Sequence, residues 1–173
     1  MTSATRYAND QLSSGVTRLV PATTAIATVG CGLVAGLLFI FSVCIMPSLR
    51  RQPAAHAIST MQSINVTILN PLFFLVFMGS TVLCAALGIV SVFSDAPGRG
   101  LRIAAAVLFL VGVIGVTAAF TVPLNDQLAK VVPGSAHGAD VWRDYLSRWP
   151  LFNHVCAAAA TAATGLFAWS ARR

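Results

Sequence analysis

Four long stretches of the sequence contain no Asp, Glu, Lys or Arg, and the charged residues collect between them. A helix rises 1.5 Å per residue, so each stretch is long enough to cross a hydrocarbon core of about 30 Å. Because lipid offers the backbone no hydrogen-bond partners, each stretch should be helical. The pattern predicts an all-α integral membrane bundle of four transmembrane helices, at about 21–46, 66–93, 102–125 and 149–170. We expect one domain, 19–173, after a polar N-terminal tail, 1–18.

The connections carry predictions of their own. Residues 47–65 read as a helix that continues into the second span, where Pro71 should introduce a kink. Residues 141–147 read as a short interfacial helix between the third and fourth spans, with Trp142 and Tyr145 on its apolar side. Pro150 would then lie in the first turn of the fourth span, where its missing N–H costs nothing.

Composition supports a membrane location. Of the 173 residues, 57% are hydrophobic and only 9% are charged, against about 25% charged residues in soluble domains. The net charge of +6 comes from single and paired basic residues at segment ends. Anionic headgroups favour that placement, whereas a nucleic-acid site would need a basic run interleaved with aromatics. We therefore expect the lipid bilayer as partner and exclude nucleic acid.

The number of spans fixes a topology for a multi-pass protein of the cell membrane. Both termini and the 94–102 turn fall on one side with six basic residues, and the other connections carry five. The positive-inside rule then favours cytoplasmic termini. Gly32 and Gly36 form a small-residue face through which an oligomer can pack. The four Cys lie in apolar stretches without C-x-x-C spacing, which is typical of small buried hydrophobes.

Candidate chemistry gathers on the side opposite the termini. The polar, ionisable and aromatic residues expected there are His56, Asn125, His137, Trp142, Trp149, Asn153 and His154. Trp142, Trp149, Asn153 and Cys156 are spaced seven, four and three apart, so one helix would present them on one face. The pattern predicts a polar and aromatic pocket at the mouth of the bundle.

Each of these residues also has a structural explanation. Trp142 and Trp149 suit an aromatic belt at headgroup depth, and Asn125 suits a helix C-terminal cap. Asn153 and Asn70 suit interhelical hydrogen bonds. His154 is harder to explain in this way, because an ionisable side chain inside a membrane helix usually faces a cavity or a partner. A metal site of several His has no H-x-x-H or H-x-x-x-H spacing to support it.

Two motifs carry a resemblance to a known family. They are V-P-x-N, at Val122 to Asn125, and W-x6-W-x3-N-H-V, from Trp142 to Val155. With Met46-Pro47 ending the first helix and Asn70-Pro71 in the second, the chain resembles the anthrone oxygenase-like family of small four-helix membrane proteins. It departs from the family pattern at Cys156, where an Arg usually follows the N-H-V triplet.

The resemblance implies that a polyketide anthrone is oxidised to an anthraquinone with O2. An anthrone is acidic enough to form an enolate, and the electron-rich carbanion can reduce O2 without a cofactor. The resemblance then suggests His154 as the base, with Asn125 and Asn153 as donors to the enolate oxygen. The residues expected to bind the substrate are Trp142, Trp149, Asn70 and Tyr145.

Two alternative functions remain open, and a third is disfavoured. A metal-dependent oxidoreductase would hold Cu or Fe at His154, with His56 as a second ligand. A non-enzymatic membrane protein, such as an accessory subunit or a lipid-binding bundle, would use the same polar groups to fix helix packing. A transporter is disfavoured, because no acidic residue lies within an apolar stretch to couple ions.

Overall fold

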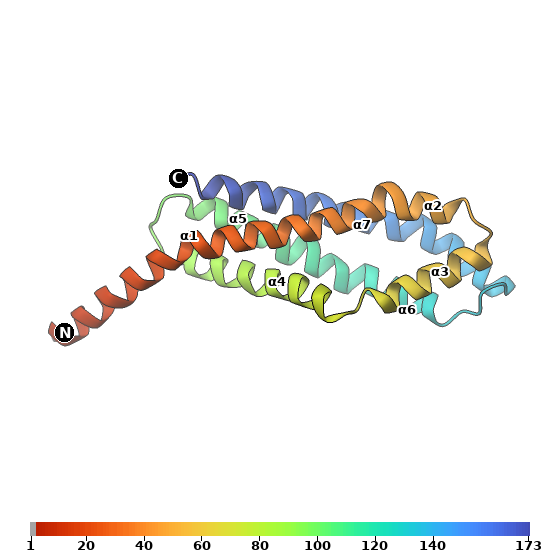
Figure 1. The fold of residues 1–173 in the computed structure, drawn as a ribbon, viewed down its shortest axis with the longest axis horizontal. Coiled ribbons are helices and arrows are strands. Elements are labelled where there is room, and N and C mark those ends of the chain that lie inside the picture. The colour runs from red at the N-terminus through yellow and green to blue at the C-terminus, as the bar shows by residue number, and fades with distance from the viewer. Residues whose placement is uncertain (1–2) are drawn as a thin grey trace.

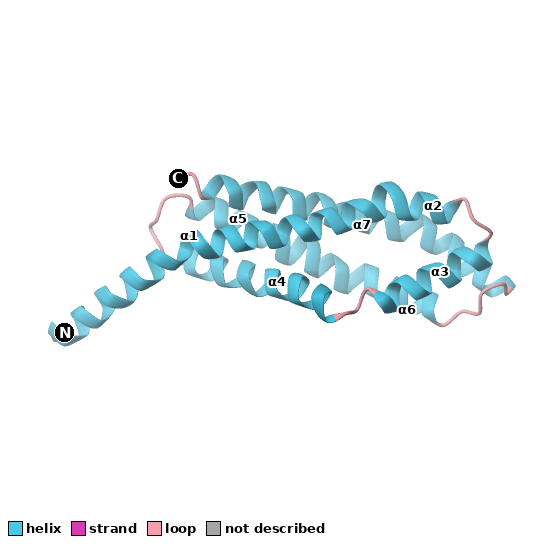
Figure 2. Cartoon of the chain, viewed as in Figure 1, coloured by secondary structure: helices cyan, strands magenta, loops and turns pink. Residues whose placement is uncertain are grey.

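The fold is all-α, as the sequence predicts, and four of its helices are long and apolar enough to cross a membrane. The computed structural model describes residues 3–173, with side chains from residue 19 onward, and within that range every regular element is a helix (Figures 1 and 2). The candidate spans are Leu19–Arg50, Pro71–Val92, Arg99–Ala129 and Ala136–Ser170. The α-helices are α1 (Ser3–Ile40), α2 (Met46–Arg50), α3 (Ala54–Thr67), α4 (Pro71–Val92), α5 (Arg99–Phe109), α6 (Val122–Ala129) and α7 (Ala136–Ser170). Three π-helical segments interrupt the spans: η1 (Phe41–Ile45), η2 (Leu110–Gly115) and η3 (Thr117–Thr121).

The four long helices pack as a ring in which α1 contacts α4 and α7, and α5 contacts the same two helices. This part of the molecule has a core of small and apolar side chains, including Ala27, Cys31, Ala105, Phe109 and Ala160. Small residues let helix backbones approach closely, which is how membrane helices gain contact area. We call this part the bundle.

A second apolar core lies at the end of the molecule opposite the two termini (Figure 1). The short helices α2, α3 and α6 surround the first half of α7 there. Its buried side chains are larger and more aromatic, and include Ile58, Met61, Leu128, Trp142 and Tyr145. We call this part the cap. Because α7 runs through both cores, it positions the cap relative to the bundle.

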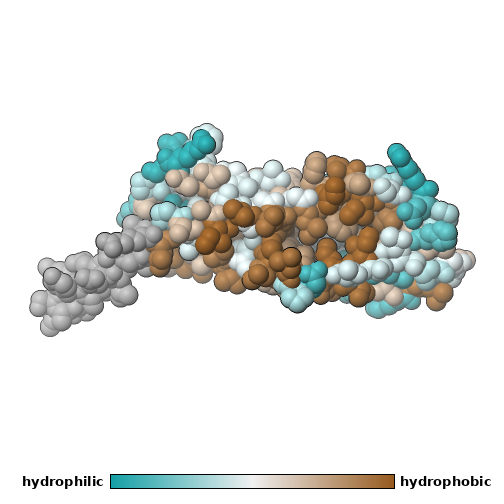
Figure 3. Space-filling model, in the orientation of Figure 1, coloured by the Kyte–Doolittle hydropathy of each residue, from teal (hydrophilic) through white to brown (hydrophobic). Residues whose placement is uncertain are grey.

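The length of α4 indicates how much of the molecule suits a bilayer. Its 22 residues make a helix about 33 Å long, which matches the hydrocarbon core of about 30 Å. Its outward side chains are apolar: Leu72, Leu75 and Val82 are each more than 60% exposed. Figure 3 shows hydrophobic residues over the middle of the molecule and hydrophilic residues mostly at its two ends. These features are compatible with a multi-pass membrane protein.

Two predictions about the second span need correction. Residues 54–67 form a separate helix, α3, instead of continuing into the span. Pro71 does not kink a helix, because it stands at the first position of α4, where a missing N–H costs nothing. Asn70 is the N-cap, and its Oδ1 accepts from the Phe73 amide at 3.0 Å.

The separate interfacial helix predicted at 141–147 also needs correction, because α7 is continuous from Ala136 to Ser170 through Pro150. A proline inside a helix leaves the carbonyl four residues earlier without its N–H partner. That carbonyl belongs to Leu146, and Arg50 Nη2 donates to it at 3.2 Å. The guanidinium replaces the missing donor, so the helix continues.

Two prolines further along the spans each follow a π segment. Pro47 comes just after η1, and Pro123 comes just after η3. A π turn bonds each N–H five residues back and tolerates a local irregularity that a regular α-helix would not. As a result the third span continues to Ala129, beyond the predicted end at 125. The side chains of the tail, 1–18, lie outside the described residues.

The Gly32 and Gly36 face remains a prediction. A methyl group added at Gly32 would contact Thr164 of α7 at 3.6 Å, so part of this face packs inside the bundle. Gly36 has nothing within 4 Å of such a methyl group and is open.

Candidate functional site

An aromatic ladder runs along the first half of α7. The rings of Trp142 and Tyr145 stack with centroids 5.5 Å apart, and those of Tyr145 and Trp149 with centroids 5.8 Å apart. Phe41 of η1 continues the ladder at 5.7 Å from Trp149. Spacings of three and four residues place the α7 rings on one face. All four side chains are buried, so the ladder is the centre of the cap core.

The middle of the ladder holds a polar contact. The Tyr145 hydroxyl donates to Asn125 Oδ1 at 2.8 Å. Tyr145 is 1% exposed, and a buried hydroxyl without a partner would be costly. Asn125 therefore ties α6 to α7. Within the described residues its amide nitrogen has no protein acceptor.

A second polar cluster joins η1 to the centre of α7. Asn153 Nδ2 donates to the Leu38 carbonyl and to Ser42 Oγ, both at 2.8 Å. Ser42 Oγ also lies 2.9 Å from His154 Nδ1 and donates to the Leu38 carbonyl at 3.1 Å. Asn153 is 1% exposed, whereas His154 is exposed on the outside of α7. We call these three side chains the Ser42 cluster.

One buried donor has no partner. Trp149 Nε1 is the single buried side-chain nitrogen or oxygen, among residues with described side chains, that makes no hydrogen bond. Such a group normally costs about 1–3 kcal/mol, so an unpaired one deserves an explanation. Trp149 lies one turn from Asn153 on α7, next to the Ser42 cluster.

The structure separates the predicted catalytic residues into two groups. Asn153 and His154 belong to the Ser42 cluster, and Asn125 belongs with Tyr145 in the cap. Trp149 lies on α7 between Tyr145 and Asn153. Asn70 stands apart from both groups, because it is exposed and caps α4.

The residues suggested for a metal also differ in placement. His56 is exposed on α3, while His154 is held at Ser42. Nowhere in the described part of the chain do three His, Cys, Asp or Glu side chains gather as metal ligands. The residues present therefore offer at most an incomplete ligand set.

Sequence reasoning missed Ser42. Ser and Thr in membrane helices commonly hydrogen-bond their own carbonyl four residues earlier, and Thr24, Thr81 and Thr121 do so here. Ser42 makes that bond as well, so its residue type gave no sign of the longer-range contacts. A serine four residues before a Met-Pro pair was the only available signal, and it is weak.

Cys156 fills the position at which the family pattern has Arg. Its thiol is 1% exposed and lies 3.8 Å from both the Val113 carbonyl and Thr117 Oγ1, beside η2 and η3. The buried contacts with a carbonyl and a hydroxyl suit a small weak donor. A guanidinium in this place would have no described carboxylate to pair with.

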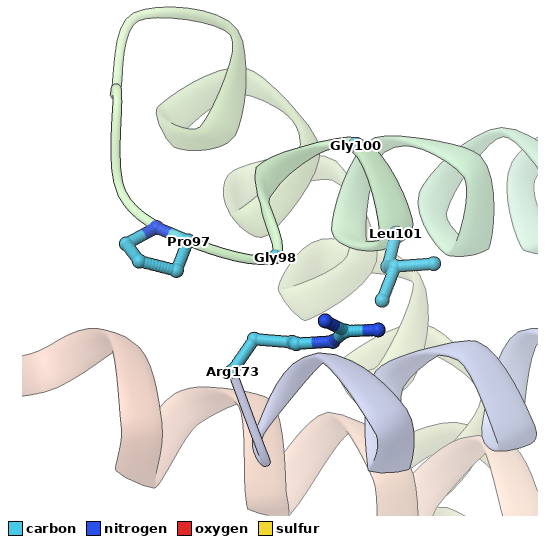
Figure 4. A pocket seen from close by; sticks show the side chains of 5 residues that line it. All are labelled: Pro97, Gly98, Gly100, Leu101 and Arg173. Carbon is cyan, nitrogen blue, oxygen red and sulfur yellow. The ribbon is translucent and has the colours of Figure 1, made fainter.

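Two surface hollows lie away from these clusters. One, of about 600 Å³, is at the end with the termini, where the Arg173 side chain lies across from Gly100 and Leu101 (Figure 4). The other, of about 500 Å³, is an apolar groove between α1 and α4 with Gly30 and Ser80 in its lining.

Comparison with known proteins gives one match. The family model described as anthrone oxygenase matches residues 73–166, which is more than half of the chain. The matched range includes Asn125, Trp142, Trp149 and the Asn153-His154 pair. No curated protein and no solved structure matches the chain. The resemblance in the two motifs is thus confirmed by a match over most of α4 to α7, and the chain belongs to the anthrone oxygenase family.

Proposed function

We propose that this protein is a membrane oxygenase that oxidises a hydrophobic, anthrone-like aromatic with O2, using His154 as the base. One observation carries the proposal. His154 is an ionisable side chain on an otherwise apolar stretch of α7; its Nδ1 is anchored at 2.9 Å from Ser42 Oγ while the ring stays exposed. A substrate arriving from the lipid phase can reach a base in that position.

The reaction needs no reductant besides its substrate. The base removes one proton from the methylene carbon of the anthrone, and the enolate passes one electron to O2. The resulting radical pair combines to a peroxide, which takes up a proton. Loss of the second methylene proton then breaks the O–O bond and leaves a ketone and water. One oxygen atom enters the product and the other leaves as water.

Two N–H donors, on Asn125 and Trp149, are available to hydrogen-bond the substrate oxygen. Both Asn153 N–H groups are already used by Leu38 and Ser42, so Asn153 serves mainly to position the cluster. Asn125 Oδ1 accepts from Tyr145, whereas the Asn125 amide nitrogen and Trp149 Nε1 have no partner among the residues with described side chains. Donors aimed at a developing oxyanion in a dry site stabilise it strongly. Because Trp149 is only 6% exposed, substrate binding has to displace a neighbouring side chain to reach it.

The proposal is tested by O2 consumption of the purified protein with an anthrone. We expect turnover in the wild-type protein and a loss of at least about 100-fold with His154→Ala, because a positioned general base contributes roughly 10²–10⁴-fold. His137→Ala is the matched control, since His137 is exposed in the first turn of α7, and it should keep full activity. Full turnover in the His154→Ala variant would refute the base role.

A chelator separates the proposed mechanism from its metal-dependent alternative. Turnover that survives chelation and is lost with His154 fits oxidation without a cofactor. Turnover that is lost on chelation and restored by Cu or Fe would identify a metalloenzyme, in which His154 is a ligand.

A second candidate function is a non-enzymatic membrane protein, and one observation favours it. Both N–H groups of Asn153 are satisfied by Leu38 and Ser42, and Asn125 Oδ1 by Tyr145, as expected if these groups only fix helix packing. This candidate predicts no O2 consumption with any anthrone. It also predicts that His154→Ala lowers the melting temperature, because the variant loses the contact with Ser42 that joins α7 to η1.

A further inference from the structure

The Ser42 cluster contains four short contacts between three side chains and one carbonyl. Asn153 Nδ2 contacts the Leu38 carbonyl and Ser42 Oγ at 2.8 Å, Ser42 Oγ contacts the same carbonyl at 3.1 Å, and Ser42 Oγ lies 2.9 Å from His154 Nδ1. The carbonyl can only accept, and the amide nitrogen can only donate. These two facts restrict where the remaining hydrogens can lie.

A serine hydroxyl has one hydrogen to donate and two lone pairs to accept with. If that hydrogen goes to the Leu38 carbonyl, Ser42 Oγ can accept from Asn153 Nδ2 and from a hydrogen on His154 Nδ1. All four contacts are then hydrogen bonds. If the hydrogen goes to His154 Nδ1 instead, the 3.1 Å contact with Leu38 brings two acceptors together without a hydrogen. Only a hydrogen on Nδ1 satisfies the whole cluster.

We propose that Ser42 is a positioning residue that holds neutral His154 in its Nδ1–H tautomer, leaving the lone pair of Nε2 free on the exposed side of the ring. Sequence position supports this reading, since Ser42 belongs to η1 and its neighbour Phe41 packs against Trp149. The same π segment therefore fixes both the histidine ring and the end of the aromatic ladder. Asn153, buried at 1% exposure, fixes the Ser42 hydroxyl from the other side.

The consequence for chemistry rests on the proposed function. A base that accepts a proton on Nε2 becomes a cation with hydrogens on both ring nitrogens. The Nδ1–H bond to Ser42 is present before and after that step, so no hydrogen bond breaks when the proton is taken up. In the opposite tautomer Nε2 already carries a hydrogen, and His154 could not act as a base toward a substrate on its exposed side.

The tautomer is measured without any substrate, by nitrogen NMR of histidine-labelled protein in detergent micelles at a pH where the ring is neutral. We expect the His154 signals of the Nδ1–H form in the wild-type protein and a shift toward the Nε2–H form in Ser42→Ala. Ser42→Thr keeps the hydroxyl and should keep the wild-type signals. Ser147→Ala, which removes an exposed hydroxyl from α7, the helix of His154, is the matched control.

Two outcomes would overturn the inference: an Nε2–H tautomer in the wild-type protein, or an unchanged tautomer in a folded Ser42→Ala variant. Because the spectrum needs no turnover, this test stands even if no anthrone is oxidised. If the proposed function holds, Ser42→Ala should also lower kcat by about 10-fold or more with little change in KM. The reason is that the Nε2–H tautomer cannot accept a proton on the exposed side of the ring. A normal kcat with an altered tautomer would contradict the base role of His154 and leave the Ser42 inference intact.

Discussion

At the scale of single residues, the hydrogen bond between Tyr145 and Asn125 stabilises the cap in addition to the aromatic ladder. The hydroxyl is buried and donates at 2.8 Å across to α6. Tyr145→Phe keeps the ring stacking and removes only this bond. We expect a loss of about 1 kcal/mol in the free energy of unfolding, seen as a lower melting temperature in detergent.

The control for that variant is Ser147→Ala, whose hydroxyl is exposed and bonds only to its own helix. It should melt within error of the wild-type protein. An unchanged melting temperature for Tyr145→Phe would mean that solvent replaces the bond, and that Asn125 is not a structural anchor of α6.

Some candidate residues could be predicted from the sequence, while others could not. His154 could be identified because an ionisable side chain in an apolar helix usually faces a cavity or a partner. Trp142, Tyr145 and Trp149 could be identified because their spacing places them on one face. Their burial in the cap core could not be predicted, since spacing fixes a face and not the helix that covers it. Ser42 remained hidden, because its contacts run 111 and 112 residues along the chain.

At the scale of helices, Pro150 and Arg50 act together in α7. Pro150 removes the donor to the Leu146 carbonyl, and Arg50 supplies one at 3.2 Å. A double-mutant cycle tests the coupling. Arg50→Met should lower the free energy of unfolding by about 0.5–1 kcal/mol, given the exposure of the pair. The same change should cost almost nothing in a Pro150→Ala background, where the backbone N–H returns; equal costs in both backgrounds would show that the contact is incidental.

Close packing between helices makes a second prediction at this scale. A methyl group at Gly112 of η2 would lie 2.6 Å from the Ala159 methyl carbon of α7, whereas one at Gly36 would meet nothing within 4 Å. Gly112→Ala should therefore destabilise the bundle by about 1–3 kcal/mol through overpacking.

Gly36→Ala is the matched control and should leave stability unchanged or raise it slightly, since Ala favours helices over Gly. Thermal unfolding in detergent measures both. If Gly36→Ala instead lowers stability or changes the oligomeric state, Gly36 lies in an interface between copies of the chain.

The helices themselves follow closely from the apolar stretches, but their ends do not. The 66–93 span was predicted five residues too long at its start, because Asn70 caps α4 and residues 54–67 form a helix of their own. The 149–170 span was predicted too short, because the sequence does not show that Arg50 donates to the Leu146 carbonyl left without a partner by Pro150. Both errors arise where a tertiary contact or a cap overrides hydrophobicity.

At the scale of the whole molecule, the two cores make the ends of the protein different. The bundle matches a bilayer in length. The candidate chemistry lies in the cap and where the cap meets the bundle. The basic residues favour cytoplasmic termini by six to five, so we predict that the cap lies on the outer side. Asp95→Cys and His137→Cys test this with a membrane-impermeant thiol reagent in intact cells. We expect labelling at position 137 only, above the background of the wild-type cysteines; labelling at position 95 only would invert the topology.

Deuterium exchange shows whether His154 removes a proton from a carbon acid at the edge of the bundle. The purified protein is incubated with an anthrone in deuterated buffer without O2, and the methylene hydrogens are followed by mass spectrometry. We expect faster exchange with the wild-type protein than with buffer alone, unaffected by a chelator and lost in His154→Ala. Exchange at the buffer rate with the wild-type protein, or undiminished exchange with His154→Ala, would contradict it.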